Sequence, residues 1–290
     1  MLKTVWLTGK PNIDETGCVM LLGGFDGLHA GHQRLLERAK DYGLPIGITS
    51  IVGGKGKEAL FTEQEREELF RLFGIDFVFE LPFEEIKDVT PEAFASLLQE
   101  KFPVKAFVCG EDFRFGAGAR GTPKTLKTST QVCVEVEELV KIDGEKVSTS
   151  ALKEWIAIGE VEKCNALLGY AYFLIGCVYA DRKIGRTIGF PTANIAYPKG
   201  KFPLKQGVYE TRVTVGGNEY KGITNYGARP TFDNEDTLTE TYLDGFSGDL
   251  YGKQLTVRFV RFLREIQKFE SADALKEQLQ RDIRRVRTND

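Results

Sequence analysis

The sequence VMLLGGFDGLHAGH, residues 19–32, carries the clearest structural signal in the chain. Its first four residues are apolar, as in a short buried strand, and the two glycines that follow end that strand. A helix pattern comes next, because Leu35, Leu36 and Ala39 share one face with charged residues elsewhere. The stretch therefore predicts a strand, a glycine-rich turn and a helix in immediate succession.

Strand and helix patterns keep alternating through the rest of the N-terminal half. The predicted elements are strands at residues 44–51, 77–79 and 106–109, and helices that begin at Thr62 and Thr90. This alternation is typical of a parallel, doubly wound sheet. Ligands of such sheets bind at the carboxyl ends of the strands, which makes the turn after residue 22 a candidate site.

The pattern changes after about residue 159. Four strand candidates follow one another without helices between them, at residues 208–215, 220–226, 238–243 and 255–263. This order predicts an antiparallel sheet or barrel, followed by a closing helix with one apolar face. We therefore expect two domains, an α/β domain at residues 1–163 and a mostly β domain at residues 164–290.

The composition is that of an ordinary globular chain. The sequence has 290 residues, 42% of them hydrophobic and 28% charged, and its formal net charge is −3. This balance favours neither nucleic acid nor a membrane surface as a partner. The longest uncharged run, residues 164–180, is shorter than the roughly 20 apolar residues of a membrane span. It is better explained as a helix end, stopped by Gly169, and a buried strand.

The five cysteines are Cys18, Cys109, Cys133, Cys164 and Cys177. Their number is odd and no two of them form a Cys-x-x-Cys motif, which argues against a zinc or redox site. Four of them, all except Cys164, lie in apolar runs. We therefore expect buried, reduced thiols and a cytoplasmic protein.

The sequence contains only two histidines, His29 and His32, and both lie at the predicted helix start. Glycines at a strand-to-helix turn let a phosphate approach the backbone, and a helix N-terminus favours an anion. Histidines three residues apart can both point at that phosphate and donate to oxygens that gain charge during in-line attack. Gly31 between them leaves room for a nucleotide, so the constellation suits nucleotidyl transfer.

Two other interpretations of the histidine pair stay open at this point. They could be metal ligands, although no third histidine exists and only Asp26 lies nearby. They could also be incidental residues at the start of a surface helix. The turn matches neither the Walker pattern nor the Rossmann Gly-x-Gly-x-x-Gly pattern.

Two later segments support phosphate chemistry. Residues 110–116 follow a predicted strand, where a loop meets the same ligand edge. The Ser148-Thr149-Ser150 run precedes a helix with Lys153, and hydroxyls with a lysine at a helix N-terminus form an anion site or a simple N-cap.

A second candidate site lies in the β half, at residues 183–194. Its glycines permit a tight loop around a polyphosphate, with Lys183 and Arg186 supplying charge. Thr192 and Asn194 are oxygen ligands suited to Mg²⁺, and they are equally well explained as turn residues. Glu240, in a predicted strand, could project into a barrel mouth as a base, or could be an ordinary exposed glutamate.

These motifs together resemble bacterial bifunctional riboflavin kinase/FAD synthetases. Residues 24–33 are similar to the adenylyltransferase signature of that family, and residues 110–116 and 147–153 to its two later motifs. Residues 189–194 resemble the riboflavin kinase signature, and further kinase motifs follow in order at 207–209, 225–231, 248–252, 263–264 and 268–269. The family usually ends its last adenylyltransferase motif in arginine, where this chain has Lys153.

The resemblance implies a nucleotidyltransferase domain and a riboflavin kinase barrel that convert riboflavin to FMN and then to FAD, with ATP as co-substrate and Mg²⁺ as cofactor. It implies that His29 and His32 stabilise the transferring phosphate, that Glu240 is the catalytic base and that Arg264 contacts phosphate or flavin. Thr192 and Asn194 would bind the magnesium-nucleotide, and Ser148, Thr149 and Lys153 the leaving pyrophosphate. The nucleotide- and phosphate-binding residues that we expect, some from the residue pattern and the others from the resemblance alone, are Gly24, Phe25, Asp26, Gly27, Gly31, Gly110, Asp112, Ser148, Thr149, Ser150, Lys153, Lys183, Gly185, Arg186, Gly189 and Pro191.

Alternatives to this enzyme assignment remain. A flavin- or nucleotide-binding regulatory protein on the same scaffold would have lost one or both activities. RNA binding through arginines of the closing helix has little support, because such residues are usually the solvated face of a helix. We expect small-molecule substrates, no nucleic acid or membrane partner, and a monomer or weak homo-oligomer.

Overall fold

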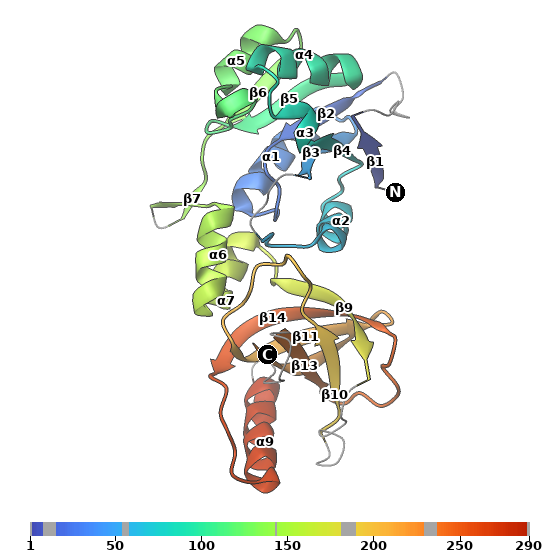
Figure 1. Ribbon diagram of the computed structural model, residues 1–290, viewed down its shortest axis with the longest axis vertical. Helices are drawn as coiled ribbons and strands as arrows, with labels where there is room; N and C mark the ends of the chain where they lie inside the picture. Colours follow the sequence, from blue (N-terminus) through green and yellow to red (C-terminus); the bar gives the residue numbers. More distant parts are fainter. Residues whose placement is uncertain are drawn as a thin grey trace. The chain divides into compact units, whose positions relative to one another are not determined.

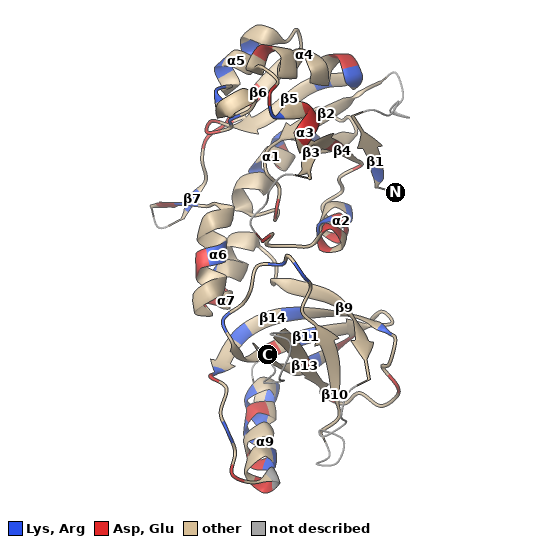
Figure 2. Ribbon diagram, in the orientation of Figure 1, with Lys and Arg blue, Asp and Glu red and all other residues tan. Residues whose placement is uncertain are grey.

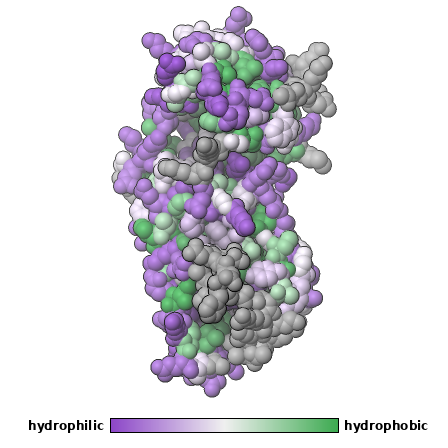
Figure 3. Space-filling view, in the orientation of Figure 1, coloured by the Kyte–Doolittle hydropathy of each residue, from purple (hydrophilic) through white to green (hydrophobic). Residues whose placement is uncertain are grey.

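The computed structural model describes residues 2–7, 16–53, 58–142, 144–180, 190–228 and 237–288. The chain divides into two compact units, Met1–Thr149 and Ser150–Asp290, and the division after residue 163 expected from the sequence stays a prediction. Within these ranges, no helix combines the length and the apolar character that crossing a membrane requires. On the face drawn in Figure 3, apolar residues lie in small groups separated by hydrophilic ones.

The N-terminal unit is built on a parallel sheet of six strands (Figure 1), which confirms the predicted doubly wound architecture. In spatial order the strands are β1 (Lys3–Trp6), β4 (Phe77–Pro82), β3 (Ile46–Val52), β2 (Cys18–Leu22), β5 (Val104–Gly110) and β6 (Cys133–Glu137). The helices of this unit are α1 (Ala30–Lys40), α2 (Glu63–Leu72), α3 (Phe83–Ile86), α4 (Pro91–Lys101) and α5 (Pro123–Ser129). A two-stranded hairpin, β7 (Lys141–Ile142) with β8 (Glu145–Lys146), precedes the end of the unit.

The central strand β2 marks the point where the order of the sheet reverses. All five of its residues are buried, and it pairs with β3 on one side and β5 on the other. The chain winds outward from β2 through β3 to β4 and then crosses to β5 on the opposite side of β2. Open α/β sheets bind ligands outside the carboxyl ends of their strands at such a switch point.

Helix ends in this unit follow the capping signals of the sequence. Thr62 and Glu65 form the predicted capping box of α2, and the Thr90 hydroxyl accepts a hydrogen bond from the Ala93 amide at the start of α4. Two strands of this unit lacked a clear signal in the sequence: β1, which has four residues, and β6, in which Glu135 and Glu137 interrupt the apolar pattern.

The C-terminal unit contains a closed antiparallel barrel, as predicted. In spatial order its strands are β10 (Thr192–Ala196), β13 (Thr237–Leu243), β12 (Asn218–Ala228), β11 (Gly207–Val215), β14 (Gln254–Arg264) and β9 (Phe173–Tyr179). Helix α6 (Thr149–Ile158) begins at the junction of the two units, and α7 (Val161–Leu168) and α9 (Ala272–Thr288) complete the second unit. Gly169 ends α7 in the left-handed conformation, as the sequence predicted.

Alternate residues of the barrel strands face opposite ways. Thr211, Thr224 and Thr241 are fully buried and their hydroxyls form a chain, with oxygen–oxygen distances of 2.9 and 3.0 Å. Ile223 precedes Thr224 on β12, so its side chain lies on the opposite face of the strand, where it packs with Ile283 of α9. Because a helix cannot fit inside a six-stranded barrel, the α9 side is the outer face and the threonines point inward.

The expected burial of the cysteines is correct for only some of them. Cys18, Cys109 and Cys164 are buried, and burial raises the pKa of each thiol to about 12. Cys133 and Cys177 are exposed, so that expectation was wrong for these two. The physical reason is strand position: Cys133 begins the edge strand β6, and Cys177 lies on the outward face of β9.

Candidate active sites

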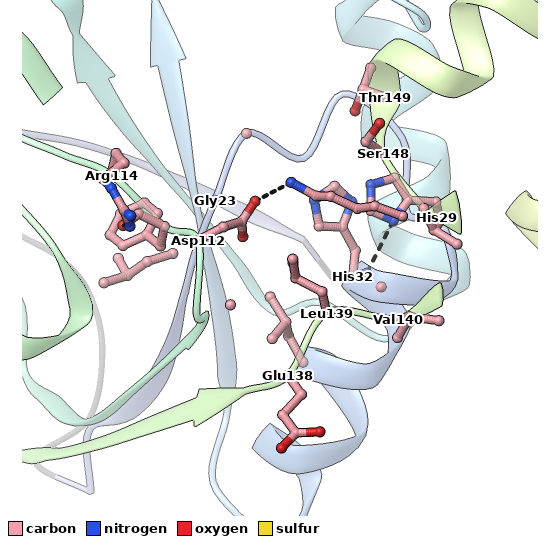
Figure 4. Close-up of a pocket in the computed structure, with 18 of the residues that line it drawn as sticks. Gly23, His29, His32, Asp112, Arg114, Glu138, Leu139, Val140, Ser148 and Thr149 are labelled. Carbon is pink, nitrogen blue, oxygen red and sulfur yellow. Dashed lines mark hydrogen bonds and ion pairs between the residues drawn. The ribbon is translucent and has the colours of Figure 1, made fainter. Parts of the chain in front are cut away.

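A cavity of about 400 Å³ lies at the carboxyl edge of the parallel sheet (Figure 4). Its lining includes Gly23 and Gly24 after β2, Gly110 and Asp112 at the end of β5, and Glu138 after β6. The strands at the switch point of the sheet therefore end at one cavity, which is where a ligand is expected.

His29 and His32 lie together in the wall of this cavity. His29 is the N-cap of α1, where its Nδ1 accepts a hydrogen bond from the His32 backbone N–H at 3.3 Å. The two imidazole rings are stacked, with centroids 3.7 Å apart and planes 14° from parallel (Figure 4). The predicted convergence of the two side chains on one site is thus a direct result of the first turn of α1.

The hydrogen bonds of the two rings assign opposite tautomers to them. His29 Nδ1 accepts a hydrogen bond, so the proton of the neutral ring is on Nε2. His32 Nδ1 lies 2.6 Å from the Gly27 carbonyl oxygen and donates to it, so the Nε2 of the neutral ring is unprotonated. In the neutral pair, therefore, His29 offers a donor and His32 an acceptor.

Both histidines are neutral at physiological pH. Burial, followed by the neighbouring His32 ring, lowers the pKa of His29 to about 3. Burial also lowers the pKa of His32 to about 4, although the Gly27 carbonyl and the carboxylates of Asp112 and Asp26 act in the opposite direction. A cation at this wall must therefore come from another side chain or from ligand-induced protonation.

Three predicted phosphate contacts hold the turn instead of lining the cavity. The Asp26 carboxylate accepts hydrogen bonds from the Leu60 and Phe61 amides, at 2.7 and 3.3 Å. Phe25 is buried with its ring 4.7 Å from that of His32, and the Gly27 carbonyl accepts a hydrogen bond from His32 Nδ1. These residues fix the positions of the histidines.

Gly24 and Gly31 both line the cavity, but a side chain at each position would meet different surroundings. A Cβ on Gly31 would lie 3.2 Å from the His29 ring, so glycine permits the close packing of that ring. A Cβ on Gly24 would have no atom of the described residues within 4 Å. Only a ligand in the cavity would therefore meet a side chain at position 24.

The charged groups of the cavity include two that sequence reasoning did not assign to the site, Lys146 and Arg114. Lys146 forms an ion pair with Asp112. Lys146 lies two residues before Ser148 in the sequence, and this proximity could have indicated that it belongs to the site. Ser148 and Thr149 line the cavity, whereas Ser150 and Lys153 do not.

In the second unit, part of the predicted site lies outside the described residues, namely Lys183, Gly185, Arg186 and Gly189. Pro191 is exposed immediately before β10, and Thr192 and Asn194 are the first and third residues of that strand. The interpretation of Thr192 and Asn194 as turn residues is therefore wrong.

Cross-strand register brings three polar residues into one row. Glu240 on β13 pairs with Asn194 on β10 and with Asn225 on β12. Its neighbours Thr239 and Thr241 are fully buried in the barrel, so Glu240 lies on the outer face rather than in the barrel mouth. Asn194 is 9% exposed, and among the described residues its Oδ1 and that of Asn225 are buried without a hydrogen-bond partner.

The oxygen donors of this row fit a magnesium ion. Asn194 offers a buried, unpaired amide oxygen, and Thr192 offers a hydroxyl two residues earlier on the same face of β10. Mg²⁺ prefers oxygen ligands and commonly takes the rest of its shell from phosphates and water. Within the described ranges no cluster of three His, Cys, Asp or Glu residues could hold a metal.

Arg264 lies at the end of β14 and is bound to α9. Its Nη2 and Nε lie 2.9 and 3.0 Å from one carboxylate oxygen of the buried Asp282. Helix α9 carries both basic and acidic residues (Figure 2), and Arg287 near its end forms a two-pronged ion pair with Asp244 at 2.7 Å. These contacts tie α9 to the barrel.

Both units are similar to known protein families. A family model described as FAD synthetase matches residues 12–151, and one described as riboflavin kinase matches residues 168–289. A bifunctional riboflavin kinase/FMN adenylyltransferase of Bacillus subtilis is 31% identical, with coverage of 97% of this chain and 96% of the relative. One of Haemophilus influenzae is 32% identical, with 92% coverage of both.

Among solved structures, the crystal structure of a macrolide-efflux protein from Streptococcus pneumoniae matches with a TM-score of 0.90 and 27% identity, over 99% of both chains. The sequence relatives named above are more than 30% identical over nearly their whole length. The chain therefore belongs to the family of bifunctional riboflavin kinase/FMN adenylyltransferases.

Proposed function

We propose that this chain makes FAD from riboflavin in two ATP-dependent steps. The C-terminal unit transfers the γ-phosphate of ATP to riboflavin, which gives FMN and ADP. The N-terminal unit transfers AMP from a second ATP to FMN, which gives FAD and pyrophosphate. The observation that carries the proposal is the pair of separate sites, each with groups suited to one step: stacked neutral histidines in a cavity, and a carboxylate between unpaired amide oxygens.

For adenylyl transfer, His29 is the donor in its resting state. Its Nε2–H is free of the cap hydrogen bond and can stabilise the charge that develops on the α-phosphate oxygens. His32 becomes a donor only when protonated, and the negative charge of a bound triphosphate raises its pKa in that direction. The stacked geometry disfavours two protonated rings at once, because like charges 3.7 Å apart repel.

The remaining cavity groups serve the phosphates in this proposal. Gly24 and Gly31 let the nucleotide approach the backbone at the N-terminus of α1. Ser148 and Thr149 hold the leaving pyrophosphate, and Lys146 exchanges Asp112 for phosphate when ATP binds. Lys153 and Ser150, which do not line the cavity, keep only their sequence-based assignment.

For riboflavin phosphorylation, Glu240 takes the proton of the primary hydroxyl of the side chain. The oxygen of that hydroxyl forms a bond to the γ-phosphorus while the bond to the β-phosphate oxygen breaks, and ADP leaves. Thr192 and Asn194 would hold Mg²⁺, which supplies charge neutralisation of the phosphates when bound. The buried, unpaired Asn194 Oδ1 supports this assignment.

The test is a coupled assay with purified protein, riboflavin, ATP and Mg²⁺, followed by chromatography of the flavins. We expect FMN first and FAD afterwards. Glu240→Gln removes the base and should block FMN formation while supplied FMN is still converted to FAD. Flavin binding without any turnover would replace the proposal with the regulatory alternative. The cytoplasmic location and the monomeric or weakly oligomeric state stay predictions.

A further inference from the structure

The most unusual polar groups outside the histidine cavity are the two amide oxygens that flank Glu240. Asn194 and Asn225 occupy the positions directly opposite Glu240 on the two neighbouring strands, and both Oδ1 atoms are buried without a hydrogen bond among the described residues. Burying an acceptor without a hydrogen bond destabilises the fold, and such groups are rare in native proteins. Asn194 has an explanation as a metal ligand, whereas Asn225 has none so far.

The barrel fixes Asn225 on the same outer strip as the base. Directly opposite residues of an antiparallel pair have Cβ atoms about 4.5–5.5 Å apart, so Asn194, Glu240 and Asn225 form a continuous row. The preceding residue on β12, Thr224, is held inward by hydrogen bonds to Thr211 and Thr241. Register slippage would turn these threonines outward, so Asn225 is held beside Glu240.

The order of the row indicates which ligand Asn225 meets. On one side of Glu240, β10 carries the proposed magnesium ligands and therefore the nucleotide. In phosphoryl transfer the leaving and attacking oxygens lie on opposite sides of the transferred group, and the base contacts the attacking hydroxyl. The acceptor alcohol consequently approaches from the β12 side, where Asn225 lies.

We propose that Asn225 binds the acceptor and positions it, with its Oδ1 accepting a hydrogen bond from the 4′-hydroxyl of the riboflavin side chain. That hydroxyl is adjacent to the primary hydroxyl that is phosphorylated, so holding it brings the primary hydroxyl to Glu240. An amide oxygen accepts but does not ionise, so it binds a polyol without adding charge near the phosphates. This inference rests on the proposed kinase function of the C-terminal unit.

The experiment compares Asn225→Ala and Asn225→Asp with Asn218→Ala, an exposed asparagine at the start of the same strand. In Asn225→Ala we expect the KM for riboflavin to rise about tenfold or more, as for loss of one hydrogen bond to a buried group. The KM for ATP and the adenylylation of supplied FMN should not change. With 4′-deoxyriboflavin as substrate, the wild type and Asn225→Ala should become equivalent.

Asn225→Asp tests the same point without removing the acceptor oxygen. The aspartate side chain still accepts a hydrogen bond, so the KM for riboflavin should stay near that of the wild type and the preference for riboflavin over 4′-deoxyriboflavin should remain. If Asn225→Ala does not fold, the wild type and this variant decide by their response to the deoxy substrate. A structural role alone would leave riboflavin and 4′-deoxyriboflavin with the same KM.

Several results would overturn the inference. The first is an equal rise in the KM for ATP and the KM for riboflavin. The second is an Asn225→Ala variant that behaves like Asn218→Ala. The third is an Asn225→Ala variant that prefers riboflavin over 4′-deoxyriboflavin as strongly as the wild type does. Its failure is distinguishable from failure of the kinase proposal. If Glu240→Gln still phosphorylates riboflavin, the proposed kinase site is wrong. If Glu240→Gln is inactive and Asn225→Ala behaves like the wild type, the kinase site stands and only the proposed role of Asn225 is wrong.

Discussion

The two candidate sites are assembled in different ways, and the difference follows from their sheets. In the parallel sheet, one strand–turn–helix stretch supplies both histidines, and crossover connections bring later loops to the same edge. In the antiparallel barrel, Asn194, Asn225 and Glu240 come from three strands and meet only through register. A parallel sheet concentrates a site at strand ends, and a barrel distributes it across strands.

The electrostatics of the two sites differ as well. The N-terminal cavity keeps two imidazoles neutral by burial, so its donors act without a fixed charge on the rings. The outer row of the barrel instead presents a carboxylate next to unpaired amide oxygens, which suits a cation and an alcohol. Because the two sites share no residue, a substitution in one site should leave the activity of the other site unchanged.

The largest effect is expected from His29→Asn. Asparagine is a good N-cap, so α1 keeps its start while the imidazole donor is lost. Adenylyl transfer should fall by about 10²–10³-fold, as for removal of one transition-state donor, and riboflavin phosphorylation should be unchanged. Steady-state rates for each half-reaction measure this effect. An equal loss of both activities, with an unchanged circular dichroism spectrum, would show that the two sites do not act independently.

A structural effect confined to one unit is expected from Asp26→Ala. The change leaves the Leu60 and Phe61 amides without their acceptor and should lower the stability of the N-terminal unit by about 2–3 kcal/mol. Hydrogen exchange should accelerate at these two amides and not in the barrel. Asp88→Ala, at an exposed position of the same unit, is the control; unchanged exchange at Leu60 would show that the carboxylate does not hold the turn.

The histidine pair should make the N-terminal unit sensitive to acid. The folded pKa values of about 3 and 4 lie below the ordinary value of 6.5, so the unfolded chain takes up protons first as the pH falls. The stabilisation is complete above about pH 6.5 and is lost as the pH falls from there to about 4 for His32 and about 3 for His29, at about 1.4 kcal/mol per pH unit for each histidine. Urea unfolding at several pH values measures it, and a His29→Asn/His32→Asn variant with the same slope would contradict it.

The smallest effect is expected from Gly31→Ala. Its Cβ would press on the His29 ring from 3.2 Å, so adenylyl transfer should fall by less than about tenfold without loss of stability. Gly24→Ala is the matched control, because its Cβ meets no atom in the part of the chain that the structure describes and should change only the KM for ATP. If the two variants behaved alike, Gly31 would serve the nucleotide directly, as its sequence position first indicated.

Much of the fold was predictable because local signals agreed with the tertiary structure. The alternating pattern indicated the parallel sheet, the Thr62 capping box began α2, and the alternation at 256–262 matched a barrel strand. The edge strand β6 was not predictable, because its glutamates serve other contacts. Glu137 accepts hydrogen bonds from Arg34 and Arg38 of α1, which lower the pKa of its carboxyl.

The candidate sites were predictable to different depths. The histidine cavity could be located because His29, His32 and the glycines are consecutive, but the structural task of Asp26 depends on amides more than thirty residues away. Asn225 begins one of the segments that resemble the riboflavin kinase family, but nothing in the sequence indicated an individual role for it, because an asparagine in a strand pattern looks like any polar position. Only the register with Glu240 distinguishes it.

The position of His29 at the first turn of α1 has a consequence for protein engineering. An imidazole is a less common helix cap than aspartate, serine or asparagine, so replacing it with one of these is a standard route to higher thermal stability. A library screened only for heat resistance would therefore enrich substitutions at residue 29 and discard FAD synthesis in the process. Thermostable variants of this chain need a selection that scores both properties together.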